Sequence, residues 1–259
     1  LGPAIGGLLS DTSLISWFNT ATPLCFTALL TVVNMIYVYN QFPNTFTPTK
    51  TKALTFFAGF NNLKKAVGLV NMRVILLTIF LQAFGWSFFM QFYQIYLLEK
   101  FHFGAQQIGM LFGYIGIWIA ITQGGITRQI AKRFAPPEVL KVALIFLSIS
   151  ILIILLPQQT YMLYWVTPFV ALFQGLAQPN QTSIVSSLAS KENQGEILGI
   201  QQSLQSFAFT VPPVIAGFLL NFDIRLPMFV AALMTLFAWA VFFLKFKESA
   251  ASPVHVAFD

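Results

Sequence analysis

Charged residues are scarce, making up only 8% of the 259 positions. Soluble domains carry about 25%, and 57% of this chain is hydrophobic, so its composition cannot build a water-facing surface. This shortage excludes an ordinary soluble enzyme and a disordered chain. The 14 Lys and Arg residues exceed the 8 Asp and Glu residues, but they are sparse and lie between apolar runs, which argues against a nucleic-acid partner.

Cysteine and histidine are also rare. The single cysteine, Cys25, cannot form an internal disulfide or a cysteine-based metal site. The two histidines, His102 and His255, lie far apart and outside the apolar runs. An enzyme needs a nucleophile, an acid–base pair or a metal set within mutual reach. We therefore expect no catalytic residues, no metal site and no cofactor.

Long apolar stretches are what the sequence has instead. A membrane-spanning helix needs about 20 apolar residues, and the longest stretch without Asp, Glu, Lys or Arg, 142–190, fits two spans separated by a turn at 157–160. The residues before 11 resemble the end of a further span. The sequence predicts an all-α polytopic membrane helix bundle of about seven full spans plus a stub, with spans at 17–39, 74–97, 107–127, 139–156, 162–186, 197–220 and 226–244.

The basic residues predict an orientation. If the loop 40–73 is cytoplasmic, twelve of the 14 Lys and Arg residues fall on the cytoplasmic side, and only Lys100 and Arg225 fall outside. Cytoplasmic loops of membrane proteins carry this excess. We expect the loops 40–73, 128–138 and 187–196 and the C-terminus to be cytoplasmic, in the inner (plasma) membrane of a bacterium.

The first residues carry a recognisable motif. Gly2, Pro3, Gly6 and Gly7 form a GPxxGG sequence, in which the glycines allow close helix approach and the proline bends the span. It matches the end of the antiporter motif on the fifth helix of drug/proton antiporters of the major facilitator superfamily. Further stretches resemble the tetracycline efflux proteins of that group: 103–109, 122–128 with Lys132 and Arg133, 178–180, 190–196 with Gly199, and Pro212-Pro213.

This resemblance covers nearly the whole chain and implies a major facilitator fold, incomplete at its N-terminal side. Residues 1–39 would end an N-terminal bundle as the end of helix 5 and helix 6. The segment 40–73 would be the cytoplasmic central loop, either a short helix on the membrane surface or a linker. Residues 74–247 would form the C-terminal six-helix bundle, followed by the cytoplasmic tail 248–259.

The resemblance also implies a function. Two bundles would rock about a midplane site in alternating access, driving proton-coupled efflux of a small amphipathic molecule such as a drug. The expected partners are that substrate, protons, the lipid bilayer and the missing N-terminal half, which would carry the proton because no predicted span has a central acid. The alternatives are an uncoupled facilitator or uptake transporter of another solute, and a truncated membrane protein that does not transport.

Glutamines recur at helical spacing inside the predicted spans. An amide without partners in hydrocarbon costs several kcal/mol, so these side chains should face the bundle interior or a wet cavity. There they would bind substrate or bond neighbouring helices. The candidate substrate-binding residues, expected to line one cavity near the midplane, are Gln82, Trp86, Gln174, Gln178 and Gln205. A row of small residues is expected at a close helix contact: Gly109, Gly113, Gly116, Ala120 and Gly124.

Overall fold

The computed structural model describes residues 5, 6, 9, 15, 17–19, 21–41, 70–189, 194–220 and 222–247. Two compact units divide the chain, one of Leu1–Ala58 with Gly104–Tyr114 and one of Gly59–Phe103 with Ile115–Asp259. Most of the predicted central loop, the predicted tail and the motif residues Gly2, Pro3 and Gly7 lie outside the described residues.

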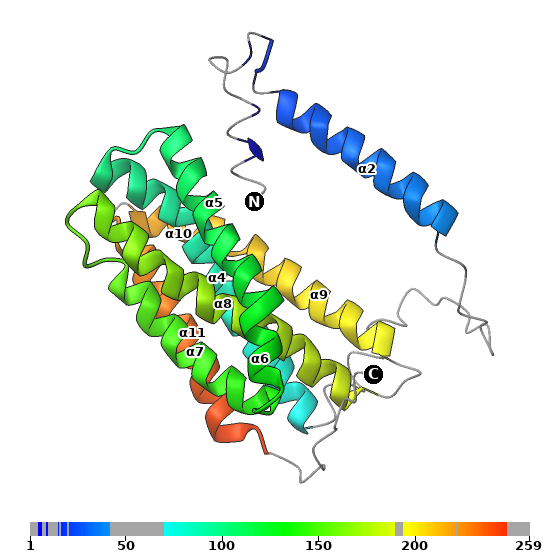
Figure 1. Cartoon of the computed structure of the whole chain (residues 1–259). Coiled ribbons are helices and arrows are strands. Elements are labelled where there is room, and N and C mark those ends of the chain that lie inside the picture. The colour runs from blue at the N-terminus through cyan, green and yellow to red at the C-terminus, as the bar shows by residue number, and fades with distance from the viewer. Residues whose placement is uncertain are drawn as a thin grey trace. The chain divides into compact units, whose positions relative to one another are not determined.

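Every predicted span coincides with a helix or with consecutive helical segments, which confirms the all-α membrane bundle. Within the described residues all regular secondary structure is helical (Figure 1). The elements are α2 (Thr22–Gln41), α4 (Val70–Phe101), α5 (Ala105–Ile121), the π-helix η1 (Thr122–Ile126), α6 (Thr127–Ala131), α7 (Pro136–Ile153), α8 (Thr160–Leu188), α9 (Gln194–Thr210), α10 (Pro212–Leu220) and α11 (Leu226–Lys245).

Five helical stretches in the described part of the chain are long and apolar enough to cross a membrane: α2, α4, the stretch from α5 to α6, α7 and α11. The helix α8 has sufficient length, but its amides lower its hydropathy. The span predicted at 197–220 is interrupted at Val211, between α9 and α10. Pro212 lacks an N–H group and restricts the residue before it, so one helix ends there and the next begins with proline in its first turn.

One feature of the helix that runs from α5 to α6 was not predicted. Its residues 122–126 form a π-helical turn, η1, which holds Gly124 and Gly125. Single π-helical turns inside α-helices occur often at functional sites. At Gly124 the expectation of a close helix contact is wrong, since no atom of the described chain lies within 4 Å of an added Cβ. The Gly-rich turn therefore changes the local helix geometry rather than admitting a neighbour at that point.

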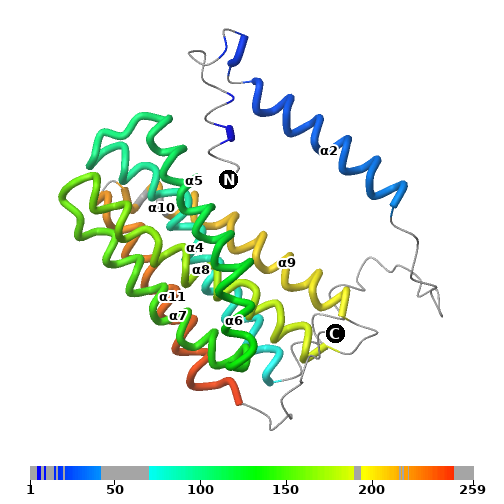
Figure 2. The backbone as a smooth tube through the Cα atoms, viewed as in Figure 1, coloured from blue at the N-terminus to red at the C-terminus, as the bar shows by residue number. Residues whose placement is uncertain are grey.

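The helix α4 lies at the centre of the second unit. It packs most extensively against α11 and also contacts α8, α9 and α10, while α7 packs against α8 and α11. The long helices of this unit run side by side, with their connections at the two ends (Figure 2). Because α4 has neighbours on several sides, it is buried around much of its circumference, and its apolar residues need no single-faced pattern.

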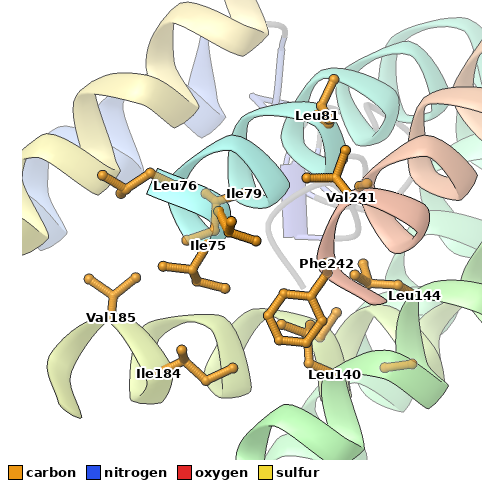
Figure 3. Close-up of a cluster of buried hydrophobic side chains, with 14 of the residues drawn as sticks. Ile75, Leu76, Ile79, Leu81, Leu140, Leu144, Ile184, Val185, Val241 and Phe242 are labelled. Carbon is orange, nitrogen blue, oxygen red and sulfur yellow. The ribbon is translucent and has the colours of Figure 1, made fainter. Parts of the chain in front are cut away.

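The core of this unit is built from branched aliphatic and aromatic side chains. Ile75 and Ile79 of α4 are fully buried and point into the space between α8 and α11 (Figure 3). Phe242 of α11 closes the cluster toward α7, where Leu140 and Leu144 are also fully buried. In the bilayer such close packing, rather than exclusion of water, holds helices together. This cluster positions α4 and α8, the helices that carry four of the five candidate substrate-binding residues.

A lysine joins α4 to the connection between α7 and α8. The Nζ atom of Lys100 donates to the carbonyl oxygens of Pro157 and Leu155, at 2.8 and 3.3 Å, and to the Tyr96 hydroxyl at 2.7 Å. It also lies 5.2 Å from the centroids of the Tyr96 and Phe101 rings, within cation–π range. The carbonyls near the end of α7 have no helical donors of their own, so this ammonium group satisfies them.

We expect Lys100→Met to destabilise the bundle, although methionine has an unbranched side chain like that of lysine. Hydrogen bonds to charged groups contribute about 1.5–3 kcal/mol, and the substitution leaves the Leu155 and Pro157 carbonyls without this donor. The thermal unfolding midpoint in detergent should fall clearly. Lys245→Met, at an exposed position on α11, is the matched control and should leave the midpoint unchanged. Equal midpoints for both variants would contradict this role of Lys100.

Candidate substrate site

Two of the candidate glutamines meet inside the bundle. Gln82 comes from the middle of α4 and Gln174 from the middle of α8, and Gln82 Nε2 donates to Gln174 Oε1 over 2.7 Å. Both side chains are buried, with exposed fractions of 3% and 7%. Since only one N–H and one carbonyl oxygen are used in this bond, each amide keeps further donors and acceptors. The pair therefore links the two helices, and it keeps donors and acceptors that this bond does not use.

Trp86 lies one helical turn from Gln82 on α4. Its indole ring is half-buried and stacks on Phe89, with ring centroids 5.0 Å apart and planes at 23°. The aromatic series continues along α4, because Phe89 stacks in turn on Tyr93 at 4.9 Å. Aromatic rings offer flat apolar surfaces, and their π faces attract cations. Phe89 and Tyr93 are fully buried, so Trp86 is the partly exposed ring of this series that adjoins the amide pair on the same helix.

The other two candidates are placed differently. Gln178, one turn beyond Gln174 on α8, is exposed, and Gln205 on α9 is half-buried. The structure brings Gln82 and Gln174 into contact, and no hydrogen bond joins Gln178 or Gln205 to either of them within the described part of the chain. That all five residues line one cavity stays a prediction.

Two further glutamines, present in the same helical rows but outside the candidate set, are buried. Gln201 of α9 is 6% exposed and donates from Nε2 to Thr182 Oγ1 of α8 over 3.1 Å. Gln181 of α8 is 1% exposed, and neither atom of its amide has a hydrogen-bond partner among the described residues. The spacing of Gln181 at seven residues from Gln174 was a signal that the buried row extends along α8.

Two glycines bring neighbouring helices close beside the amide pair. A Cβ atom added to Gly85 of α4 would lie 2.7 Å from the carbonyl oxygen of Ala231 in α11. One added to Gly175 of α8 would lie 2.9 Å from the Thr122 side chain in η1. Sequence reasoning missed both, because each is a lone glycine rather than part of a row of small residues. These contacts hold Gln82 and Gln174 on rigidly packed segments.

Among the described residues, no charged side chain accompanies the amide pair. The charged residues of the described helices lie near the helix ends, away from Gln82 and Gln174. Within the residues that the structure describes, no group of three or more His, Cys, Asp or Glu side chains could hold a metal ion. The chemistry that this arrangement offers is neutral hydrogen bonding and aromatic contact, which suits binding rather than bond making.

Helical spans around a buried amide pair define an integral membrane helix bundle. The chain belongs to the Major Facilitator Superfamily, whose family model matches residues 1–211 and also 75–258. This membership places it among transport proteins rather than enzymes, as the sequence predicted.

Two relatives indicate which members of the superfamily the chain resembles. The chain is 25% identical over 235 residues to "Multidrug resistance protein 1" of Bacillus subtilis (strain 168). It is 26% identical over 238 residues to "Quinolone resistance protein NorA" of Staphylococcus aureus (strain COL). Each alignment covers 89% of this chain and 57% of the relative, so the chain spans little more than half the length of these relatives. They support the drug-antiporter resemblance, while the finer likeness to tetracycline efflux proteins stays a prediction.

Proposed function

We propose that the protein containing this chain is a secondary transporter that exports small amphipathic drugs in exchange for protons. The observation that carries the proposal is the Gln82–Gln174 pair, a buried polar link in a membrane bundle of a transporter superfamily. The names of the relatives support drugs, including quinolones, as the substrate class. Alternating access of two bundles about this region is part of the proposal.

Neutral amides suit substrates of varied charge. The free carbonyl and N–H groups of Gln82 and Gln174 would accept from an amine or donate to a carbonyl of the drug. Trp86 would stack on a planar ring system, and a cationic drug would gain from its π face. Since no fixed charge from the described helices lies beside the pair, the site would favour shape and apolar area over one particular ion.

The proton carrier is proposed to lie outside this chain. Intramembrane acids are the usual carriers of protons in transporters, and no Asp or Glu lies at the centre of a span in the sequence. The same observation favours a second candidate, an uncoupled facilitator. The distribution of Lys and Arg supports the proposed orientation, with the C-terminus in the cytoplasm of a bacterial plasma membrane.

The test is quinolone accumulation in bacteria that lack their own efflux pumps and express the complete gene product containing this chain. We expect accumulation to fall several-fold relative to an empty vector. A protonophore should restore it, because it removes the proton gradient. Accumulation that reaches the empty-vector level sooner but never falls below it, with or without the protonophore, would assign the facilitator function instead. Accumulation that never falls would contradict drug export.

A further inference from the structure

A basic hollow lies at the end of α6, and its residues are distant in sequence from both members of the amide pair. Its volume is about 370 Å³, and it is lined by Gln129, Ile130, Lys132, Arg133 and Phe134. The two cations and Phe134 are exposed, whereas Ile130 is half-buried against the core of the second unit. The hollow thus combines a charged rim with an apolar wall.

The length of the preceding helix would bring this hollow to the depth of the lipid headgroups. The apolar helical stretch Ala105–Ala131 has 27 residues. At a rise of 1.5 Å per residue it is roughly 40 Å long, whereas the hydrocarbon core of a bilayer is about 30 Å thick. A helix of this length centred in the bilayer would extend about 5 Å beyond the hydrocarbon at each end. Lys132 to Phe134, which follow its last residue, would then lie at the depth of the phosphate groups and glycerol esters.

The sequence around the hollow carries an excess of positive charge. No Asp or Glu occurs between Glu99 and Glu138 in the sequence. The nearest acid along the chain, Glu138, accepts a hydrogen bond at 3.2 Å from the Ala135 amide at the start of α7. Within the described residues neither Lys132 nor Arg133 forms an ion pair. Arg128, one turn before Lys132, adds a third positive charge.

We propose that this hollow binds the headgroup of an anionic phospholipid. The phosphodiester would accept charge-assisted hydrogen bonds from Arg133 and Lys132, with Arg able to bind two oxygens at once. The Gln129 amide would donate to a glycerol ester carbonyl, and Ile130 with Phe134 would contact the start of an acyl chain. Basic pockets at the cytoplasmic side of membrane helices bind such headgroups. This inference is independent of the transported substrate.

The experiment is native mass spectrometry of the purified chain in micelles holding equal amounts of phosphatidylglycerol and phosphatidylcholine. We expect one phosphatidylglycerol to be retained in preference to phosphatidylcholine. The double variant Lys132→Gln, Arg133→Gln should reduce that preference by about thirtyfold, since each basic residue near a membrane surface contributes about 1 kcal/mol. Equal retention of both lipids by the unmodified chain would overturn the proposal.

The matched control is Lys245→Gln, Lys247→Gln, which removes the same charge from exposed positions at the last residue of α11 and just after it. This control variant should retain phosphatidylglycerol as the unmodified chain does. If it loses the lipid as much as the Lys132, Arg133 variant does, the lipid is attracted by net charge and not by a specific site. Thermal unfolding in neutral detergent checks that each variant is folded; all four positions are exposed, so unchanged midpoints are expected. Excess inorganic phosphate should leave the bound lipid in place, and its displacement would identify a site for soluble anions.

Discussion

Replacing Gly85 with valine is expected to separate α4 from α11 and to cause a large loss of stability. An added Cβ would lie 2.7 Å from the Ala231 carbonyl oxygen, 3.0 Å from Thr235 Oγ1 and 3.2 Å from Met234 Cβ. The nearest of these atoms belongs to the backbone, which cannot rotate away as a flexible side chain would. Overpacking costs about 1–3 kcal/mol, occasionally more. The chain should unfold in detergent at a markedly lower temperature.

Glycine-to-alanine changes provide a graded series with a control. Gly85→Ala should lower the unfolding midpoint less than Gly85→Val, because it adds only the first carbon atom. Gly199→Ala on α9 should raise the midpoint or leave it unchanged, since nothing lies within 4 Å of an added Cβ there. Alanine is favoured over glycine in a helix by about 0.5–1 kcal/mol. A Gly85→Val chain as stable as Gly199→Ala would show that α4 and α11 are not in close contact.

The second large effect is expected at the buried amide pair. Gln82→Leu removes the donor to Gln174 Oε1 and leaves the Gln174 amide unpaired in an apolar setting. An unsatisfied buried polar group costs about 1–3 kcal/mol, and Gln174→Leu should cost a similar amount. The double variant Gln82→Leu, Gln174→Leu should recover most of the loss, because no orphaned amide remains. The three unfolding midpoints test this coupling directly.

Transport by the same double variant separates two roles of the pair. If the amides bind substrate, the complete protein carrying both leucines should remain folded but lose quinolone efflux. Gln158→Leu removes an exposed amide from the connection between α7 and α8 and should leave efflux unchanged. Full efflux by the folded double variant would assign Gln82 and Gln174 to helix packing alone.

The helical segments and most of their bounds were predictable from the sequence, because membrane insertion is decided by local composition. A membrane span is recognised from a run of about 20 apolar residues. The boundaries between runs could therefore be found from turn formers at 157–160 and from the charged residue before Leu226, where α11 begins. The break between α9 and α10 was missed, although Pro212 and Pro213 were recognised as a family position. Proline within a span is tolerated in many membrane helices, so its presence alone does not decide where a helix ends.

Which polar residues would meet was not decided by the sequence. Helical spacing placed Gln174, Gln178 and Gln181 in one row, yet Gln178 is exposed while the other two are buried. Spacing defines a face of a helix, but the neighbour that covers that face depends on how several helices pack. The partner of Gln174 is Gln82, 92 residues earlier in the chain, and no local pattern encodes that distance.

The sequence by itself determined that this chain is a membrane helix bundle with a drug-antiporter resemblance, and where its helices run, because charge and hydropathy act residue by residue. Only the tertiary structure decided that α4 lies at the centre of the second unit, that Gln82 bonds Gln174, and that Gly85 and Gly175 are sites of close packing. These are properties of pairs of distant residues. They arise from steric fit and hydrogen bonding between helices, which depend on side chains from several helices at once.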